Sequence, residues 1–120
     1  ARENATSEKN ISDLQTILND LMLNTKIYES SRLAHKVQSG MYSAIEKGYG
    51  GTRNLGVKQA PFYVLIGAEM PAILVEVGFL SNSTEKKRLM SRKYQQKIAR
   101  GICDGIDAYI ESIELVYHAR

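Results

Sequence analysis

The sequence predicts a single α/β domain that contributes about two strands and three to four helices. Its 120 residues suit one compact domain, and 43% hydrophobic residues are enough for a core. Two short runs, residues 62–66 and 72–77, are almost continuously apolar, which is typical of strands covered on both faces. The segments around them carry apolar residues every three or four positions, which predicts helices.

The first part of the chain is predicted to form two helices. Ser12-Asp13-Leu14-Gln15 fits a capping box that starts a helix over residues 11–24, with Ser12 as the N-cap and Gln15 reaching back to it. A second apolar stripe runs from Ile27 to Ile45 and should stop at Gly48. The glycine-rich loop that follows lacks the Lys-Ser/Thr pair of a P-loop, so phosphate binding is not expected there.

Each predicted strand begins after a proline and ends at a glycine. This fits a strand, because proline is tolerated at the first strand position. Two strands alone cannot make a stable covered sheet, because their outer backbone groups stay unpaired. We therefore expect neighbouring copies to associate through open sheet edges, or a longer protein to supply further strands.

The chain is predicted to return to helix after the second strand. Asn82-Ser83-Thr84-Glu85 is another capping box, with Asn82 as the N-cap. The last helix carries isoleucines at four-residue spacing from Ile98 to Ile110, and the single cysteine, Cys103, should be a small core residue beside them. Residues 114–120 form a tail without a clear signal.

The excess of positive charge is concentrated in residues 83–100, where seven cations accompany one anion, Glu85. This pattern fits either a solvated helix face or a surface for an anionic polymer such as nucleic acid, membrane or cell-wall glycan. Aromatic residues are not interleaved with the cations, so nucleic acid is not the expected partner. The apolar runs are too short to span a membrane.

Glu76 lies in the middle of the second predicted strand, where burial of an isolated carboxylate would be costly. It could face solvent from an edge strand, or pair with a buried Lys or Arg. The functional alternative places it near the carboxyl end of the strand, where the reactive crevice of an α/β sheet lies. A carboxylate there suits the work of a general base.

The stretch GVKQAPFYVLIGAEMPAILVEVGFLSN closely resembles the C-terminal half of zinc-dependent N-acetylmuramoyl-L-alanine amidases of the type-3 amidase family, which are bacterial cell-wall hydrolases. TEKKRLMSRKYQQKIARGICDGIDAYI resembles the closing helices of that family, and ARENAT resembles the segment after its last zinc-binding strand. The resemblance implies that residues 1–113 are the C-terminal half of a catalytic domain. It further implies a twisted mixed sheet with helices on both faces (phosphorylase/hydrolase-like) and a place in the cell envelope, periplasmic or secreted.

The resemblance also implies a reaction and a substrate. The family's catalytic glutamate falls at Glu76, where it would activate a zinc-bound water that cleaves the amide between N-acetylmuramic acid and the L-alanine of the peptidoglycan stem peptide. Ser81 and Asn82 match family positions too, and we interpret them as the turn from strand to helix. Ser83 stands where the family often has proline, which suits the first helical position; this difference does not affect any catalytic residue.

The zinc ligands of the family, two histidines and a glutamate, lie in the N-terminal half of its domain. His35 and His118 match neither position, so we expect no metal ligand in this chain and zinc ligands upstream of it. Some members carry an inserted helix that an activator protein displaces; helix 11–24 looks too short for that, and a plain surface helix is expected. The alternatives are a non-catalytic cell-wall-binding module on an amidase-like scaffold and an unrelated α/β domain with a structural Glu76.

Overall fold

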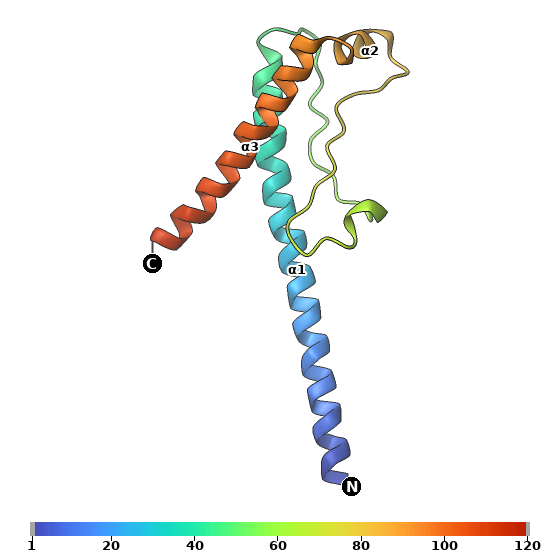
Figure 1. Ribbon diagram of the computed structural model, residues 1–120, viewed down its shortest axis with the longest axis vertical. Coiled ribbons are helices and arrows are strands. Elements are labelled where there is room, and N and C mark those ends of the chain that lie inside the picture. Colours follow the sequence, from blue (N-terminus) through green and yellow to red (C-terminus); the bar gives the residue numbers. More distant parts are fainter. Residues whose placement is uncertain (1, 120) are drawn as a thin grey trace.

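The computed structural model describes residues 2–119 and shows an elongated helical molecule with extents of 70 × 39 × 19 Å (Figure 1). The C-terminal third of the first long helix crosses the N-terminal half of the second, and a largely irregular segment runs beside the first helix before the chain enters the second. The elements in chain order are α1 (Arg2–Glu46), η1 (Tyr63–Leu65), α2 (Ser83–Leu89) and α3 (Arg92–His118). No helix among these residues has the length and apolar character needed to cross a membrane.

The predicted α/β fold is wrong, because residues 2–119 contain no strand and hence no twisted mixed sheet of the phosphorylase/hydrolase-like kind. A strand becomes stable when its backbone groups pair with those of a neighbour. The run 62–66 instead closes hydrogen bonds within itself, from Leu65 N to Phe62 O at 3.0 Å and from Ile66 N to Tyr63 O at 3.3 Å, which make the 3-10 turn η1. Residues 72–77 have no regular secondary structure, so the open sheet edges expected for self-association are not formed in this part of the chain.

The N-terminal region forms one uninterrupted helix rather than the two that were predicted. Ser12 lies inside α1, where its carbonyl oxygen accepts a hydrogen bond from the Thr16 hydroxyl at 3.1 Å. Residues 2–39 contain neither glycine nor proline, so nothing interrupts the backbone ladder. The predicted stop at Gly48 is confirmed, since the helix ends at Glu46 and Gly48 N donates to Ile45 O at 3.1 Å.

The core lies where the C-terminal third of α1 crosses α3 (Figure 1). Gly40 of α1 meets Gly101 and Gly105 of α3, and a Cβ atom on Gly101 would lie only 2.6 Å from Met41 Cα. Small residues four apart therefore let the two backbones come close enough for neighbouring apolar side chains to interlock. The buried cluster consists of Val37, Met41, Ile45, Tyr94 and Ile98.

The inward face of α3 differs in part from the predicted isoleucine stripe. Ile98 is buried as expected, whereas Ile106 and Ile110 are 39% and 46% exposed. Glycines at the crossing, followed by Tyr109, continue the buried face from Ile98. Cys103 lies off that face and is exposed, so its prediction as a core residue is wrong. Residues 114–118 continue α3.

Candidate functional site

Glu76 lies in the segment that leads from η1 to α2, and its side chain is exposed. Ile73 and Val75 pack against the α1–α3 core, while Leu74 and Glu76 are exposed. This alternation is the one that an extended backbone produces, so Glu76 lies on the side away from the helices. Of the alternatives left open by the sequence, the structure has Glu76 facing solvent rather than buried beside a Lys or Arg.

The end of this segment is fastened to α2. Glu85 Oε2 accepts a hydrogen bond from Phe79 N at 3.0 Å, and Asn82 N donates to Phe79 O at 3.1 Å. Gly78 has a φ of +155°, and a Cβ atom there would lie 3.3 Å from Leu89 Cδ1. The backbone two residues beyond Glu76 is thus held close against α2.

The predicted N-cap of α2 is confirmed. Asn82 Oδ1 accepts hydrogen bonds from Thr84 N at 3.0 Å and from Glu85 N at 3.1 Å. Glu85, however, does not close the reciprocal bond of a capping box to Asn82; its carboxylate goes to Phe79 N. The capping motif thereby joins the helix start to the segment that carries Glu76. Ser81 lies in the turn before the cap, as interpreted from the sequence.

The other end of the segment is held by α1. Ala72 N donates to Ser30 Oγ at 3.0 Å, and Lys26 Nζ donates to Leu65 O at 3.0 Å. A hollow of about 360 Å³ lies beside these contacts, between α1 and residues 69–71. Its lining includes Glu29 and Glu69 but not Glu76, so it is separate from the predicted catalytic residue.

The residues present do not fit a zinc site. His35 lies on α1 and His118 in the last turn of α3, and both are exposed. Among residues 2–119 no three His, Cys, Asp or Glu side chains gather in a way that could hold a metal ion. A structural or catalytic zinc needs three or four such ligands, which this stretch does not supply.

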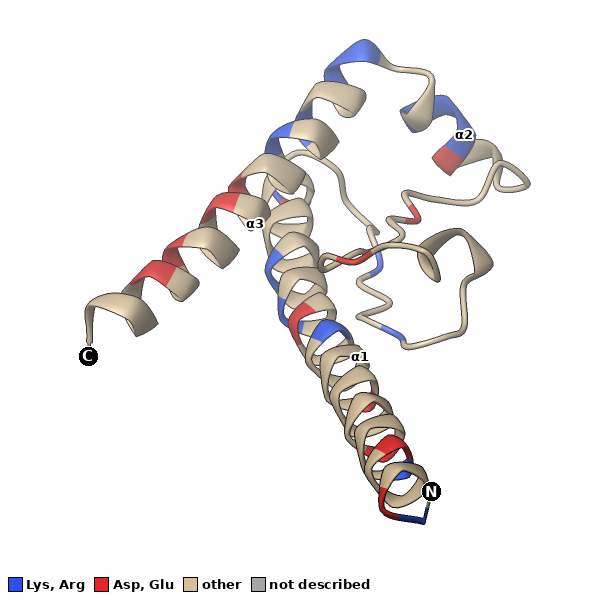
Figure 2. Cartoon of the chain, turned by 60° about the horizontal axis from the view of Figure 1, so that its bottom comes forward, with Lys and Arg blue, Asp and Glu red and all other residues tan. Residues whose placement is uncertain are grey.

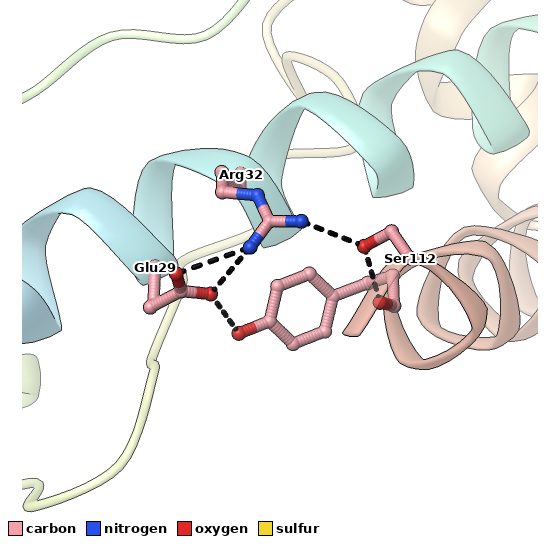
Figure 3. A network of polar contacts seen from close by, with 4 residues as sticks. Glu29, Arg32 and Ser112 are labelled. Atoms are coloured by element: carbon pink, nitrogen blue, oxygen red, sulfur yellow. Dashed lines mark hydrogen bonds and ion pairs between the residues drawn. The ribbon is translucent and has the colours of Figure 1, made fainter. Parts of the chain in front are cut away.

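A polar network that the sequence analysis missed ties α1 to α3 (Figure 3). Tyr109 OH donates to Glu29 Oε2 at 2.6 Å, and Arg32 Nη1 donates to both Glu29 oxygens at 3.1 Å. Arg32 Nη2 reaches Ser112 Oγ at 2.9 Å, and its guanidinium lies 5.7 Å from the Tyr109 ring centroid. The local Glu29–Arg32 spacing was visible in the sequence, but nothing indicated its partners on α3, 80 residues away.

The network has opposite effects on its two titratable members. The hydrogen bond from Tyr109 lowers the pKa of Glu29, and Arg32 adds to this effect against the influence of burial. Burial, followed by the hydrogen bond to Glu29, raises the pKa of Tyr109 to about 12. The phenol therefore stays protonated near neutral pH and acts as a fixed donor, which suits a clamp between helices.

Comparison with known proteins identifies the class of protein to which this chain belongs. The profile of the N-acetylmuramoyl-L-alanine amidase family matches residues 4–108, so the chain belongs to this family, of the type-3 amidase kind. The resemblance seen in the sequence around Glu76 is thereby confirmed.

Individual relatives agree with the family. The uncharacterized protein YqiI of Bacillus subtilis (strain 168) is 43% identical over 82 residues, 68% of this chain and 37% of that protein. N-acetylmuramoyl-L-alanine amidase LytC of the same strain is 38% identical over 80 residues, 67% of this chain and 15% of LytC. N-acetylmuramoyl-L-alanine amidase AmiC of Neisseria meningitidis serogroup B is 32% identical over 102 residues, 83% of this chain and 23% of AmiC. The chain thus spans well under half the length of these relatives, and no solved structure matches it.

Proposed function

We propose that this chain is the part of a cell-wall amidase that carries the general base, and that Glu76 is this base. The intact protein would hydrolyse the amide between N-acetylmuramic acid and the L-alanine of the peptidoglycan stem peptide, in the bacterial cell envelope. The observation that carries the proposal is the family match across residues 4–108, which includes the glutamate of VEVGFLSN.

The surroundings of Glu76 support this role. Its carboxylate is exposed, and the segment that carries it is held before it by the bond from Ala72 N to Ser30 and after it by the bond from Phe79 N to Glu85. Glu76 can accept a proton from an attacking water and return it to the leaving amine, which is the task of a general acid–base residue. Since residues 2–119 do not fit a zinc site, the proposal assigns the zinc ligands of the intact enzyme to residues upstream of this chain.

Replacement of the base tests the proposal in the intact protein. Glu76→Gln keeps the shape of the side chain but removes its ability to take a proton, so turnover of purified peptidoglycan should fall about 100- to 10,000-fold. Glu69→Gln is the matched control, because Glu69 is also an exposed carboxylate of the irregular segment. A rate near that of the wild type for Glu76→Gln would remove Glu76 from the mechanism.

The metal content of the chain is a second test. Because its histidines are far apart in the sequence and no cluster of ligands forms in residues 2–119, the isolated chain should bind no stoichiometric zinc. Elemental analysis after dialysis measures this directly. One tightly bound zinc per chain would contradict the assignment of all ligands to upstream residues.

A non-catalytic module that holds cell-wall polymer is the alternative function, and the cations of residues 83–100 are the feature that favours it. The two functions differ in turnover by the intact protein. Binding to purified sacculi that survives Glu76→Gln, together with an intact protein that releases no stem peptide, would favour the module.

A further inference from the structure

The charges of α3 are separated along its length (Figure 2). Lys and Arg occupy the half that follows α2, and Asp and Glu occupy the half toward the C-terminus. The cations are Arg92, Lys93, Lys97 and Arg100, and the anions are Asp104, Asp107, Glu111 and Glu114. A helix is stabilised by anions at its N-terminus and cations at its C-terminus, so this order works against the helix dipole. The arrangement therefore calls for a reason other than the stability of α3.

Helix α2 adds cations to the same end of the molecule (Figure 2). We define the basic surface as the exposed cations of α2 and the first half of α3, namely Lys86, Lys87, Arg92, Lys93 and Arg100. Arg88 and Lys97 are left out because both have a partner inside the molecule. Arg88 Nη2 donates to Gly50 O at 2.7 Å, and the two cations lie 5.5 and 5.9 Å from the Tyr49 ring centroid.

The basic surface carries far more positive than negative charge. Glu85 is the one acid between residues 83 and 100, and its carboxylate is directed to Phe79 N rather than into an ion pair with these cations. Within residues 2–119, the ion pair formed between side chains is Arg32–Glu29, which lies on α1 and outside the basic surface. Five like charges held on two consecutive helices create a local positive potential that attracts a polyanion.

We propose that the basic surface binds the anionic groups of a cell-wall polymer and holds that polymer beside Glu76. The inference rests on the proposed function, since it takes the polymer to be the one that the intact enzyme cleaves or one attached to it. Phe79, three residues after Glu76, is bonded to Glu85 at the start of α2, so the basic surface begins next to the end of the segment that carries the base. The recognised chemistry is a repeated carboxylate or phosphodiester along a flexible chain.

A nucleic acid is the less suitable partner. Proteins that hold single strands stack the bases on exposed aromatic rings. Two aromatic rings at this end are covered: Tyr94 is 5% exposed, and Tyr49 packs edge-on against it at a centroid distance of 4.8 Å. Phe79, just before the start of α2, is 61% exposed. A single exposed ring does not make the row of stacking positions that successive bases need, whereas all five cations of the basic surface are exposed. Charge is therefore the main feature that this surface offers to a partner.

Cosedimentation of this chain with purified peptidoglycan at about 0.15 M salt tests the inference, where surface electrostatics act over roughly 8 Å. The variant Lys86→Gln/Lys87→Gln/Arg92→Gln/Lys93→Gln removes four cations of the basic surface. The matched control, Arg2→Gln/Lys9→Gln/Lys36→Gln/Lys58→Gln, removes four exposed cations elsewhere. Losing four positive charges takes the formal net charge from +3 to −1 in both proteins.

We expect the basic-surface variant to bind about 10- to 100-fold more weakly. Its binding should also depend less on salt, because a protein that makes fewer charge contacts releases fewer counterions from the polymer. The control should stay within about threefold of the wild type, since its four cations lie outside the contact. The double variant Lys86→Gln/Lys87→Gln should give an intermediate loss, and far-UV circular dichroism should show the same helix content throughout. An equal loss in both fourfold variants, or no binding by the wild type, would overturn the inference.

Two preparations of the wall distinguish the source of the anions. Loss of binding after acid extraction of phosphodiester polymers identifies those polymers, and loss after amidation of the stem-peptide carboxylates identifies peptidoglycan itself. Binding that survives both treatments, or that single-stranded DNA displaces as well as wall polymer does, would refute the proposed partner. The assay involves no turnover, so its failure leaves the role of Glu76 intact, and a failure of Glu76→Gln to slow the enzyme leaves this result intact.

Discussion

The two ends of α1 have the same secondary structure and very different surroundings. Every residue from Arg2 to Thr25 is exposed, whereas Val37, Met41 and Ile45 are at most 7% exposed against α3. The first region is held by its own backbone ladder and local side-chain bonds, such as that from Gln15 Nε2 to Asn19 Oδ1 at 2.9 Å. Tertiary packing supplies most helical stability in proteins, so the two regions should respond very differently to substitution.

The comparison also shows what an apolar stripe does and does not specify. Ile11, Leu14 and Leu18 recur at helical spacing, as the buried residues of the C-terminal third do, yet they are 44–65% exposed. The buried third differs by having Gly40, which admits the backbone of α3. Periodicity predicts which side of a helix can be buried. Which part of the helix is buried depends on where another helix can approach its backbone closely.

The largest effect is expected where the two helices touch. Gly101→Ala/Gly105→Ala would place methyl groups within 2.6 Å of Met41 Cα and 2.7 Å of Lys36 O, and backbone atoms cannot move aside easily. Alanine normally favours a helix over glycine by about 1 kcal/mol, but overpacking here should cost about 4–6 kcal/mol of the free energy of unfolding. Gly50→Ala/Gly67→Ala is the control, because nothing lies within 4 Å of either position. A urea titration in which both doubles unfold at the same midpoint would refute the tight crossing.

The next effect compares two methionines of the same helix. Met41 is 7% exposed in the core and Met22 is 70% exposed in the N-terminal half. Met41→Ala should lower the free energy of unfolding by about 2–5 kcal/mol, because it leaves a cavity. Met22→Ala should change it by less than about 0.5 kcal/mol. Similar losses in thermal or urea unfolding would show that the N-terminal half is also packed.

The smallest of the three effects concerns the polar clamp between the helices. Tyr109→Phe removes the hydroxyl that donates to Glu29 and should cost about 1.5–3 kcal/mol of the free energy of unfolding, as expected for a hydrogen bond to a charged group. Tyr117→Phe is a suitable control, because Tyr117 is 78% exposed. Equal unfolding midpoints for these two variants would mean that the clamp contributes nothing.

The same clamp predicts a dependence on pH. The pKa of Glu29 is lowered in the folded state, so its contribution to stability is present above the ordinary pKa of 4.5 and is lost as pH falls below it. The pKa of Tyr109 is raised from 10.0 to about 12, so its contribution is present below pH 10 and is lost as pH rises toward 12. The difference in stability between the wild type and Tyr109→Phe should therefore shrink at both extremes. A difference that stays constant from acid to alkaline pH would separate the clamp from both ionisations.

Local signals in the sequence predicted the local features of the fold. The cap at Asn82 and the stop at Gly48 depend on a few neighbouring atoms, and both are confirmed. The strands depend on partners that lie elsewhere, and an apolar run carries no information on whether a partner exists. Ser12 failed as a cap because helix residues precede it without a break, so its amide neighbours were already paired within α1.

The candidate site divides in the same way. The motif around Glu76 could be recognised in the sequence, and the family that it indicated is confirmed. The assignment of Glu76 as the base stays a prediction for the kinetic test. The hydrogen bond from Phe79 N to Glu85 and the clamp at Tyr109 were not predicted, since each needs the three-dimensional path of the chain. Cys103 was misplaced because the four-residue spacing of the isoleucines predicted one buried face of α3. The buried face instead includes the glycines at the crossing, and Cys103 lies off it.

The clamp has a consequence for the order in which the molecule folds. Its bonds from Tyr109 to Glu29 and from Arg32 to Ser112 each join residues 80 positions apart, so the whole irregular segment and α2 must be confined in one closed loop before either bond forms. Closing such a loop costs entropy in advance, whereas α1 can propagate residue by residue within about a microsecond. We therefore expect α1 to appear first as a free rod and α3 to dock on it in the slow, rate-limiting step.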